Sequence, residues 1–305
     1  MRIFVAGATG VLGKRATRAL VAAGHDVTGI ARTPEKAAQL RDAGITPVTV
    51  GLFDAAALSD AVAGHEVVMN LATHIPDVRS AMRSRAWDEN DRIRTEGARN
   101  LVDAAIAATA SRYIQESVGF FYEDGGDEWR VEDTPLAVPE FAASFQTAEA
   151  EASRFTASGG VGVVLRFSMF YGAGASHTDT QLKTARLGLS PFPGPKDAYQ
   201  SFIHVDDAAA AVVAALAAPA GTYNVAEDEP ATRRELAAAV GRALGKRISW
   251  SIPGMARMGG AKTEYFRRSV RVSNRKFKAA TGWVPAYPAP DLGWQQVVAE
   301  TSTLR

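Results

Sequence analysis

The feature that most constrains this chain is a glycine-spaced turn near its start, Gly7-Ala8-Thr9-Gly10-Val11-Leu12-Gly13. It follows an apolar run at Ile3 to Ala6 and precedes a helical repeat in which Leu12, Ala16 and Leu20 recur every four positions. In a strand-turn-helix setting, the first glycine permits the tight turn, the second lets the backbone approach a pyrophosphate, and the third allows close packing of helix on strand. The alternative, a turn that binds nothing, is less well supported because both flanking elements are in place. The segment therefore predicts a dinucleotide-binding turn.

Alternation of short apolar runs with helical patterns continues through the first two thirds of the chain and is typical of βαβ units in a parallel sheet. The expected strands are Ile3 to Ala6, Val27 to Ala31, Val48 to Val50, Val67 to Leu71, Tyr113 to Gln115 and Val161 to Arg166. Asp54 is expected to cap a short helix that runs to Ala63. We therefore expect an α/β fold: a Rossmann-type doubly wound parallel sheet with a smaller interleaved C-terminal substrate domain.

The pattern changes after Tyr171, where glycines and prolines over residues 172–195 predict no regular element. It resumes with a strand at residues 201–205, a helix at 206–217 that Asp206 is expected to cap, and a strand at 222–225. A helix at residues 232–244 and a strand near 248–252 follow. The expected division is a dinucleotide-binding domain at residues 1–170, to which 201–225 return, and a substrate domain at 171–200 and 226–305.

Composition removes several classes of protein. The 305 residues include no cysteine, which excludes disulfide scaffolds and thiolate-bound metals. The formal net charge of +1 lacks the one-signed field that favours nucleic acid. No uncharged apolar stretch is long enough to span a bilayer, and the start is not that of a signal peptide. We expect a cytoplasmic protein with a small-molecule substrate, no nucleic acid or membrane partner, and no sequence signal for its oligomeric state.

The choice between the two nicotinamide cofactors depends on the end of the second strand, which reads Ile30-Ala31-Arg32-Thr33. Enzymes that use NAD usually carry an acid there for the ribose 2′-hydroxyl, whereas an arginine suits a 2′-phosphate. Asp26 does not fill the acidic role because it opens that strand. A guanidinium can hold a phosphate bidentately, so Arg32 predicts NADP.

Four segments together resemble the extended short-chain dehydrogenase/reductase family. They are Gly7 to Gly13, Asn70-Leu71-Ala72, Leu165-Arg166 before Tyr171-Gly172, and Phe202 to Asp207. Gly221 to Val225 and Thr281 to Pro285 are similar to the NAD-dependent epimerase/dehydratase pattern within it. The resemblance implies a Rossmann sheet, a nicotinamide cofactor and a substrate pocket between two domains. It also implies that Gly7, Thr9, Gly10 and Val11 hold the pyrophosphate, Arg32 the 2′-phosphate, and Leu71, Ala72 and Thr73 the adenosine and ribose side.

The chain departs from that family at the catalytic residues, a serine or threonine and a tyrosine followed four residues later by a lysine. One register of the helix places Ala143 and Thr147 at the Tyr and Lys positions, and the other places Phe141 and Phe145 there. The catalytic hydroxyl of the family would fall at Val118. The chain is therefore identified as an atypical member.

Other proton donors follow the carboxyl ends of predicted strands, where ligands bind in open α/β sheets. Ser117 and Tyr122 follow the fifth strand, and a phenol there needs a nearby cation or ribose hydroxyl to act at neutral pH. Glu116 adjoins them, and His74 follows the fourth strand. These four residues are the catalytic candidates, and each has an ordinary structural alternative. The five histidines have no metal-ligand spacing, so no metal is expected.

The sequence supports three functions. The first is an NADP-dependent oxidoreductase acting on a small organic substrate, with a proton donor outside the usual Tyr-Lys pair. The second is a non-redox cyclase, isomerase or dehydratase on the same fold, which the missing pair favours. The third is an NADP-sensing regulator, which could dispense with a substrate domain.

Overall fold

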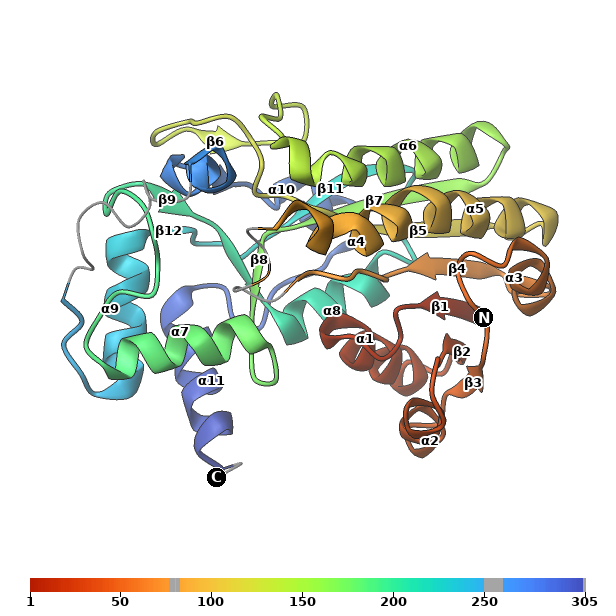
Figure 1. The fold of residues 1–305 in the computed structure, drawn as a ribbon, viewed down its shortest axis with the longest axis horizontal. Coiled ribbons are helices and arrows are strands. Elements are labelled where there is room, and N and C mark those ends of the chain that lie inside the picture. The colour runs from red at the N-terminus through yellow and green to blue at the C-terminus, as the bar shows by residue number, and fades with distance from the viewer. Residues whose placement is uncertain (77–79, 81–82, 250–259, 304–305) are drawn as a thin grey trace.

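The structure, a computed structural model, describes residues 1–76, 80, 83–249 and 260–303. Its centre is a sheet of seven parallel strands in the order β11-β7-β5-β4-β1-β2-β3 (Figure 1). Its strands are β1 (Arg2–Ala6), β2 (Asp26–Ile30), β3 (Thr46–Val48), β4 (Val67–Asn70), β5 (Arg112–Val118), β7 (Val161–Phe167) and β11 (Gly221–Val225). Ile3 pairs with Val27 on one side and Val67 on the other. The predicted Rossmann-type fold is confirmed.

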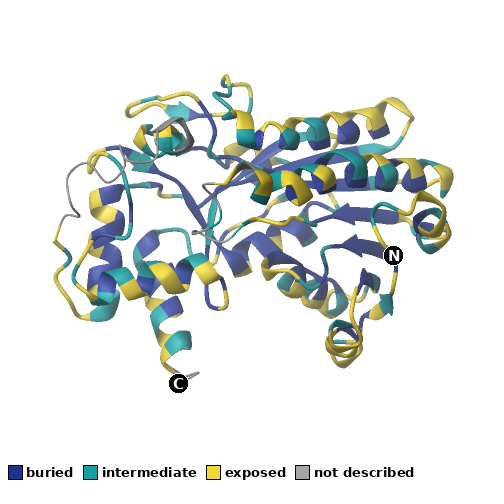
Figure 2. Ribbon diagram, viewed as in Figure 1, coloured by how far each residue is buried: buried dark blue, intermediate teal, exposed yellow. Residues whose placement is uncertain are grey.

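Helices cover both faces of this sheet. They are α1 (Val11–Ala22), α2 (Pro34–Asp42), α3 (Ala55–Val62), α4 (Asp88–Arg92), α5 (Ala98–Ala107), α6 (Ser144–Ala157), α8 (Val205–Ala214) and α10 (Arg275–Thr281). A π-helical turn, Ile93–Gly97, joins α4 to α5. Asp54 caps α3 as predicted, since its carboxylate accepts from the Ala57 N–H. Figure 2 shows the strands buried between helices whose outward faces are exposed.

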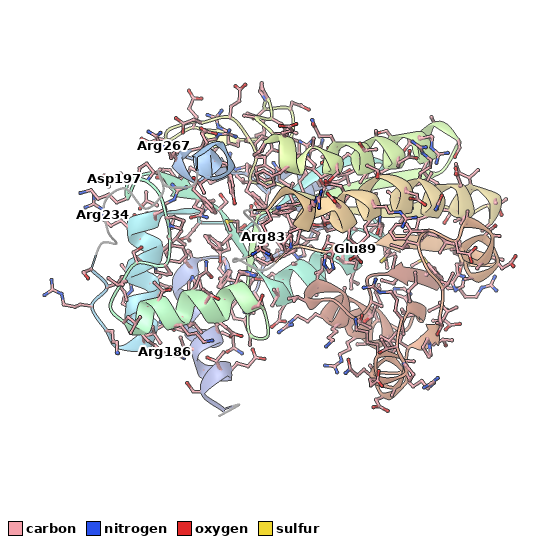
Figure 3. The ribbon with its side chains drawn as sticks, viewed as in Figure 1. Arg83, Glu89, Arg186, Asp197, Arg234 and Arg267 are labelled. Atoms are coloured by element: carbon pink, nitrogen blue, oxygen red, sulfur yellow. The ribbon has the colours of Figure 1, made fainter. Side chains whose placement is uncertain are left out.

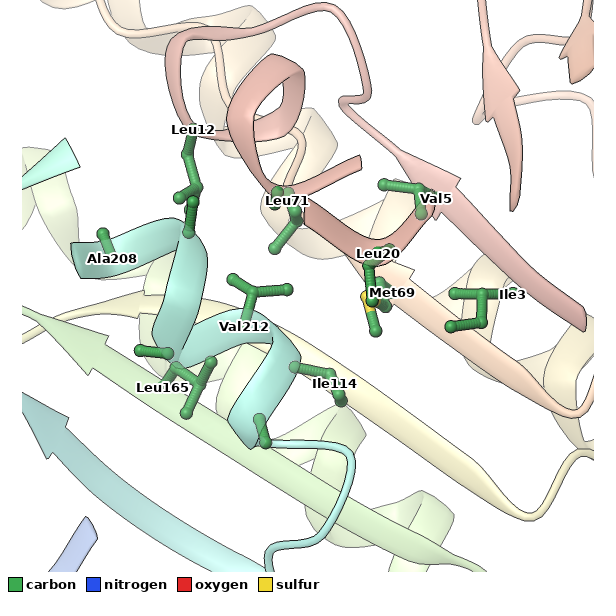
Figure 4. Close-up of a cluster of buried hydrophobic side chains, with 14 of the residues drawn as sticks. Ile3, Val5, Leu12, Leu20, Met69, Leu71, Ile114, Leu165, Ala208 and Val212 are labelled. Atoms are coloured by element: carbon green, nitrogen blue, oxygen red, sulfur yellow. The ribbon is translucent and has the colours of Figure 1, made fainter. Parts of the chain in front are cut away.

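Successive side chains along each strand point to opposite faces of the sheet, so the hydrophobic core is divided between the two faces. Ile3 and Val5 of β1 belong to one core cluster with α1 and α8, and Figure 4 shows Leu12, Leu20 and Val212 of those helices in the same cluster. The intervening residues of β1 belong to a second cluster with α3, α5 and α6. Because both faces are buried, the strands are apolar along their whole length, which is why they could be predicted.

A smaller part of the molecule lies beside the sheet. It is built on α7 (Ser176–Arg186), α9 (Arg233–Leu244) and α11 (Pro290–Thr303), with a separate core that includes Trp294. The short strand pairs are β8 (Met169–Tyr171) with β10 (Phe202–His204), β9 (Tyr199–Gln200) with β12 (Ala231–Thr232), and β6 (Trp129–Arg130) with β13 (Arg271–Val272). In Figure 1, α7, α9 and α11 lie together at the end away from β3.

Two local predictions were wrong. The stretch after Tyr171 contains α7, because the glycines and prolines flank residues 176–186 while these residues themselves have none. His204, not Asp206, caps α8, since its Nδ1 atom accepts from the Asp206 N–H at 3.3 Å. The strand predicted at residues 201–205 is present as β10, which pairs with β8 outside the main sheet.

The strand predicted near residues 248–252 and the predicted domain boundaries are not settled by the described residues. The strand expected near residues 248–252 lies mostly outside the described residues, although Ser249 forms a bridge with Leu189. The proposed domain boundaries stay a prediction; β11 does return to the main sheet after β10 and α8. Over the described parts of the chain, no helix has the length and apolarity needed to cross a membrane.

Candidate cofactor and substrate site

The predicted glycine turn lies at the carboxyl end of β1. Gly7 has φ = +81°, and a Cβ atom there would lie 2.5 Å from the Leu71 carbonyl group. A Cβ atom on Gly13 would lie 2.0 Å from the Gly7 carbonyl oxygen. Both contacts are too short for any side chain, so the turn can pass this close to β4 and α1 only with glycine at these positions. The chain order reverses between β1 and β4, and ligands bind in such sheets at that point.

The N-terminus of α1 differs from those of several other helices. Thr33, Asp54 and Thr232 cap α2, α3 and α9 by accepting a backbone N–H of the first turn. Gly10 caps α1 without a side-chain hydrogen bond, and the first turn of α1 has no acidic residue. The free N–H groups and the positive end of the helix dipole therefore face outward from the glycine turn, an arrangement that suits a pyrophosphate.

Arg32 follows β2 at the same edge of the sheet. Its side chain is 62% exposed, and its Nη1 atom lies 3.4 Å from the Glu89 Oε1 atom. The other carboxylate oxygen of Glu89 lies 3.7 Å from the Nε2 atom of His74. Figure 3 places Glu89 near the middle of the molecule, on α4. Glu89 thus lies between Arg32 and His74. The backbone N–H of His74 also donates to the Asn90 side chain at 3.0 Å.

The residues after β4 adjoin the glycine turn. Leu71 is buried, Ala72 is half-buried and Thr73 is exposed. The buried Asn70 orients this segment, because its Oδ1 atom accepts from the Ala72 N–H while its amide donates to Gln115 of β5. The exposed part of residues 71–73 lies at the strand edge that the resemblance assigns to the adenosine and ribose side.

Ser117 and Tyr122 belong to one buried polar network. The Ser117 hydroxyl donates to Glu149 at 2.6 Å, and Glu149 accepts two hydrogen bonds from Arg166 at 2.8 and 2.7 Å. Arg166 also donates to the Tyr122 hydroxyl at 3.2 Å, and that hydroxyl donates to Asn224 at 2.7 Å. Burial raises the pKa of Tyr122, which has no exposed surface. The network joins α6, β7 and β11 at their common edge and keeps the phenol protonated.

Glu116 points to the opposite face of β5 from Ser117. Its carboxylate accepts from the Nη2 atom of Arg94 at 2.9 and 3.3 Å, and the two side chains are 7% and 4% exposed. Burial raises the pKa of Glu116, while the guanidinium opposes that rise. The contacts of Glu116 are those of a buried ion pair between β5 and the π-helical turn.

Aromatic rings occupy the place where the family resemblance seeks a Tyr-Lys pair. Phe145 is buried in the first turn of α6 and stacks on Phe121, with ring centroids 5.9 Å apart. Phe141 lies edge-on to Phe121 at 6.3 Å and 6.2 Å from Tyr265. In the alternative register, Ala143 and Thr147 likewise supply no phenol or amine. The only phenol in this cluster of four rings is that of Tyr265, whose pKa burial raises.

A pocket of about 20 Å³ lies next to this cluster. Its walls come from the segment after β5, from the start of β8, from β9 and the residue that follows it, from the start of α9 and from the segment after residue 264. Tyr265, Gln200 and Arg233 are among the residues that line it. These residues could not be selected from the sequence, because none stands in a motif and only the fold brings them together.

A buried pair of titratable groups, Tyr171 and Glu227, lies in the smaller part. The Tyr171 hydroxyl donates to Glu227, which is 1% exposed, and burial raises the pKa of Glu227 to about 8. Burial lowers the pKa of the neighbouring His204 to about 4. The Tyr171 ring stacks on Trp294 and lies edge-on to His204, so the pair of Tyr171 and Glu227 adjoins the core of the smaller part.

The fold is an NAD(P)-binding fold of the short-chain dehydrogenase/reductase class. Its defining features are a parallel doubly wound sheet, a glycine turn, a helix N-terminus without a side-chain cap, and a pocket beyond β5 and β7. Residues 3–226 match the NAD dependent epimerase/dehydratase family, and the chain belongs to it. The resemblance inferred from the sequence is thereby confirmed, and family and relatives identify the chain as an enzyme of this superfamily.

Two relatives are named as reductases. The 3-diazoavenalumate denitrifying reductase of a Streptomyces species is 33% identical over 302 residues, which cover 95% of this chain and 97% of the relative. The 2-alkyl-3-oxoalkanoate reductase of Shewanella oneidensis is 29% identical over 76% of this chain and 63% of the relative. In fold, the chain is similar to the crystal structure of human epimerase family protein SDR39U1 with NADPH, with a TM-score of 0.79, 23% identity, and coverage of 98% and 99%.

Proposed function

We propose that the protein is an NADP-dependent oxidoreductase acting on a small organic substrate. The observation that carries the proposal is the position of Arg32 at the same sheet edge as the glycine turn. In this assignment Gly7, Thr9, Gly10, Val11 and Gly13 hold the pyrophosphate. Leu71, Ala72 and Thr73 line the adenosine and ribose side.

The electrostatics of Arg32 support NADP over NAD. Its pair with Glu89 is long, at 3.4 Å, and both side chains are exposed, so the pair contributes at most about 1 kcal/mol. A 2′-phosphate offers two charge-assisted hydrogen bonds to the same guanidinium and displaces Glu89 at small cost. NAD offers only a hydroxyl there. The proximity of Glu89 also connects His74 to this end of the cofactor, so we assign His74 to positioning Glu89.

Bound nicotinamide would supply or accept a hydride, and the chain must then hold the proton and the developing charge. We assign that task to Tyr265, since its phenol belongs to the aromatic cluster that replaces the Tyr-Lys pair and also lines the pocket. Its raised pKa keeps the hydroxyl protonated, so it acts as a hydrogen-bond donor. For Ser117, Tyr122 and Glu116, which were predicted as catalytic candidates, we propose a role in holding neighbouring side chains in place instead of proton transfer. Their polar atoms are already engaged within the buried network and the ion pair described above.

A hydrogen-bond donor without an adjacent lysine stabilises a localised alkoxide poorly. We therefore expect activated acceptors, such as enones, imines and 3-oxo compounds, to react better than simple ketones, because their developing charge is delocalised. The names of the two reductase relatives support reduction as the reaction type. They refer to 3-diazoavenalumate and to 2-alkyl-3-oxoalkanoates, whose chemistry belongs to those proteins.

The cofactor assignment is tested by isothermal titration with NADPH and NADH. The native protein should bind NADPH more tightly, and Arg32→Ala should lose most of that preference with NADH binding unchanged. Arg41→Ala, at the exposed end of α2, is the matched control and should retain the preference. Glu89→Gln should strengthen NADPH binding by up to about fivefold, since it removes the competing partner. Equal affinity of the native protein for both cofactors would overturn the assignment.

A further inference from the structure

Arg233 is a buried guanidinium in the wall of the pocket, at the first residue of α9. It is 2% exposed, and two of its nitrogens donate to backbone carbonyls, Nη1 to Ala198 at 3.2 Å and Nη2 to Arg268 at 3.0 Å. Its Nε atom has no hydrogen-bond partner among the described residues. Two neutral acceptors therefore hold this cation in place while one of its donors is unused.

No carboxylate in the described part of the chain forms an ion pair with Arg233. Among the described residues, the Asp124 carboxylate is the one that favours the charged form of Arg233, and it does so at longer range than an ion pair. The Oδ1 atom of Asp124 accepts instead from the Ser269 N–H at 2.6 Å. Removal of a cation from water without a counter-charge is costly, so a folded protein retains such a group where something else supplies the negative charge.

The next residue along the chain provides a direct contrast. Arg234 is exposed and pairs with Asp197 at the outer edge of the smaller part, where Figure 3 shows the two side chains together. Arg268, which also lines the pocket, is neutralised by both carboxylate oxygens of Glu264. The unbalanced charge of this region is therefore that of Arg233.

Gly194 packs closely against Arg233 at the unused donor. It has φ = +114°, and a Cβ atom there would lie 3.0 Å from the Arg233 Nε atom and 2.1 Å from the Phe266 carbonyl oxygen, so only glycine fits at this position. The nearby Gln200 is 7% exposed, and its Oε1 atom has no partner among the described residues. Phe120 and Tyr265 form an apolar wall of the same pocket. A volume of about 20 Å³ admits a small head group and leaves the rest of a ligand to lie along that wall.

We propose that Arg233 binds the carboxylate of an organic acid, so that the substrates of this enzyme are carboxylates with an unsaturated or aromatic body. This inference rests on the proposed function and names the substrate class of that site. A planar carboxylate accepts a single in-plane hydrogen bond from Nε and supplies the missing charge. A phosphate group is larger, carries more charge, and would need more free donors than the described residues offer here.

The test is isothermal titration of the full chain with cinnamate and with cinnamamide, which share a shape and differ in charge. The native protein should bind cinnamate about tenfold or more tightly than the amide, because a hydrogen bond to a charged group is lost with the amide. Arg233→Gln should abolish that difference, Arg233→Lys should restore part of it, and Arg234→Gln should leave it unchanged. Thermal unfolding of the same variants checks that each one folds.

Equal binding of the two ligands by the native protein would overturn the inference, as would an Arg233→Gln variant that still prefers cinnamate. Binding of inorganic phosphate that excludes cinnamate would reassign the pocket to phosphate and also overturn it. The readout needs no turnover. If NADPH is never oxidised while cinnamate selectivity depends on Arg233, the proposed function fails and the anion site stands; if NADPH is oxidised without that selectivity, the reverse holds.

Discussion

Removal of the Glu116 carboxylate should destabilise the protein strongly, because it leaves Arg94 as an uncompensated buried cation. The two side chains are 7% and 4% exposed, and the carboxylate accepts from a single guanidinium nitrogen at 2.9 and 3.3 Å. Another nitrogen of Arg94, Nη1, already has no partner among the described residues, so the structure offers no second acceptor. Loss of one partner of such a pair costs about 3–5 kcal/mol. For Glu116→Leu in a chain of 305 residues this corresponds to a fall in melting temperature of about 5–8 °C.

Chemical denaturation and thermal melting of Glu116→Leu, Arg94→Met and the double variant measure this directly. The double variant should be much closer to the native protein than either single variant, since it removes both charges and leaves apolar groups of similar size. NADPH affinity at a temperature where the variants are folded should change little. If the free energy of unfolding of Glu116→Leu falls by less than about 1 kcal/mol and the variant still loses turnover, the carboxylate acts on the substrate and our structural interpretation is refuted.

Three further predictions concern the network, the turn and the buried acid. Tyr122→Phe leaves Asn224 without its donor and should lower the free energy of unfolding by about 1–3 kcal/mol, measured by denaturant titration; an unchanged midpoint would contradict this. Gly13→Ala places a Cβ atom 2.0 Å from the Gly7 carbonyl oxygen and should weaken NADPH binding at least about tenfold in titration, whereas undiminished affinity would show that the turn does not approach the cofactor. The folded-state pKa of Glu227 is about 8 against an ordinary value of 4.5, so its stabilising contribution is full below about pH 4.5 and is lost as the pH rises through about 8. The free energy of unfolding of the native protein relative to Glu227→Gln should therefore fall by on the order of 4 kcal/mol between pH 5 and pH 9, and a constant difference would refute the raised pKa.

The large sheet could be predicted because its strands are buried on both faces and therefore stand out as apolar runs. The glycine turn could be predicted for a related reason: Gly7 and Gly13 are required by contacts between neighbouring elements, and those contacts impose a fixed spacing. Helix α7 could not be predicted because glycines and prolines on both sides of it indicate irregular structure. Residues 176–186 themselves contain neither and form the helix.

The polar site was harder to predict, since its contacts join residues far apart in the chain. Ser117 and Glu149 are 32 positions apart, and the network continues to Arg166 of β7. Proximity to a strand end selected Ser117 correctly as a residue of this edge but could not reveal that its hydroxyl is already engaged. Arg233 is marked in the sequence only by a helix capping box, and its unbalanced charge emerges only once burial and ion pairs are known.

The central claim is that this chain uses NADPH to reduce a small organic acceptor. The most direct measurement is the decrease of the reduced-nicotinamide absorbance when the protein is incubated with NADPH and a panel of enones, imines, 3-oxo acids and simple ketones. We predict oxidation of NADPH with at least one activated class, slower reaction with simple ketones, and a marked loss of rate in Tyr265→Phe with NADPH binding retained. If a substrate is converted while NADPH stays fully reduced, or if no acceptor oxidises bound NADPH, the claim of an NADP-dependent oxidoreductase is contradicted.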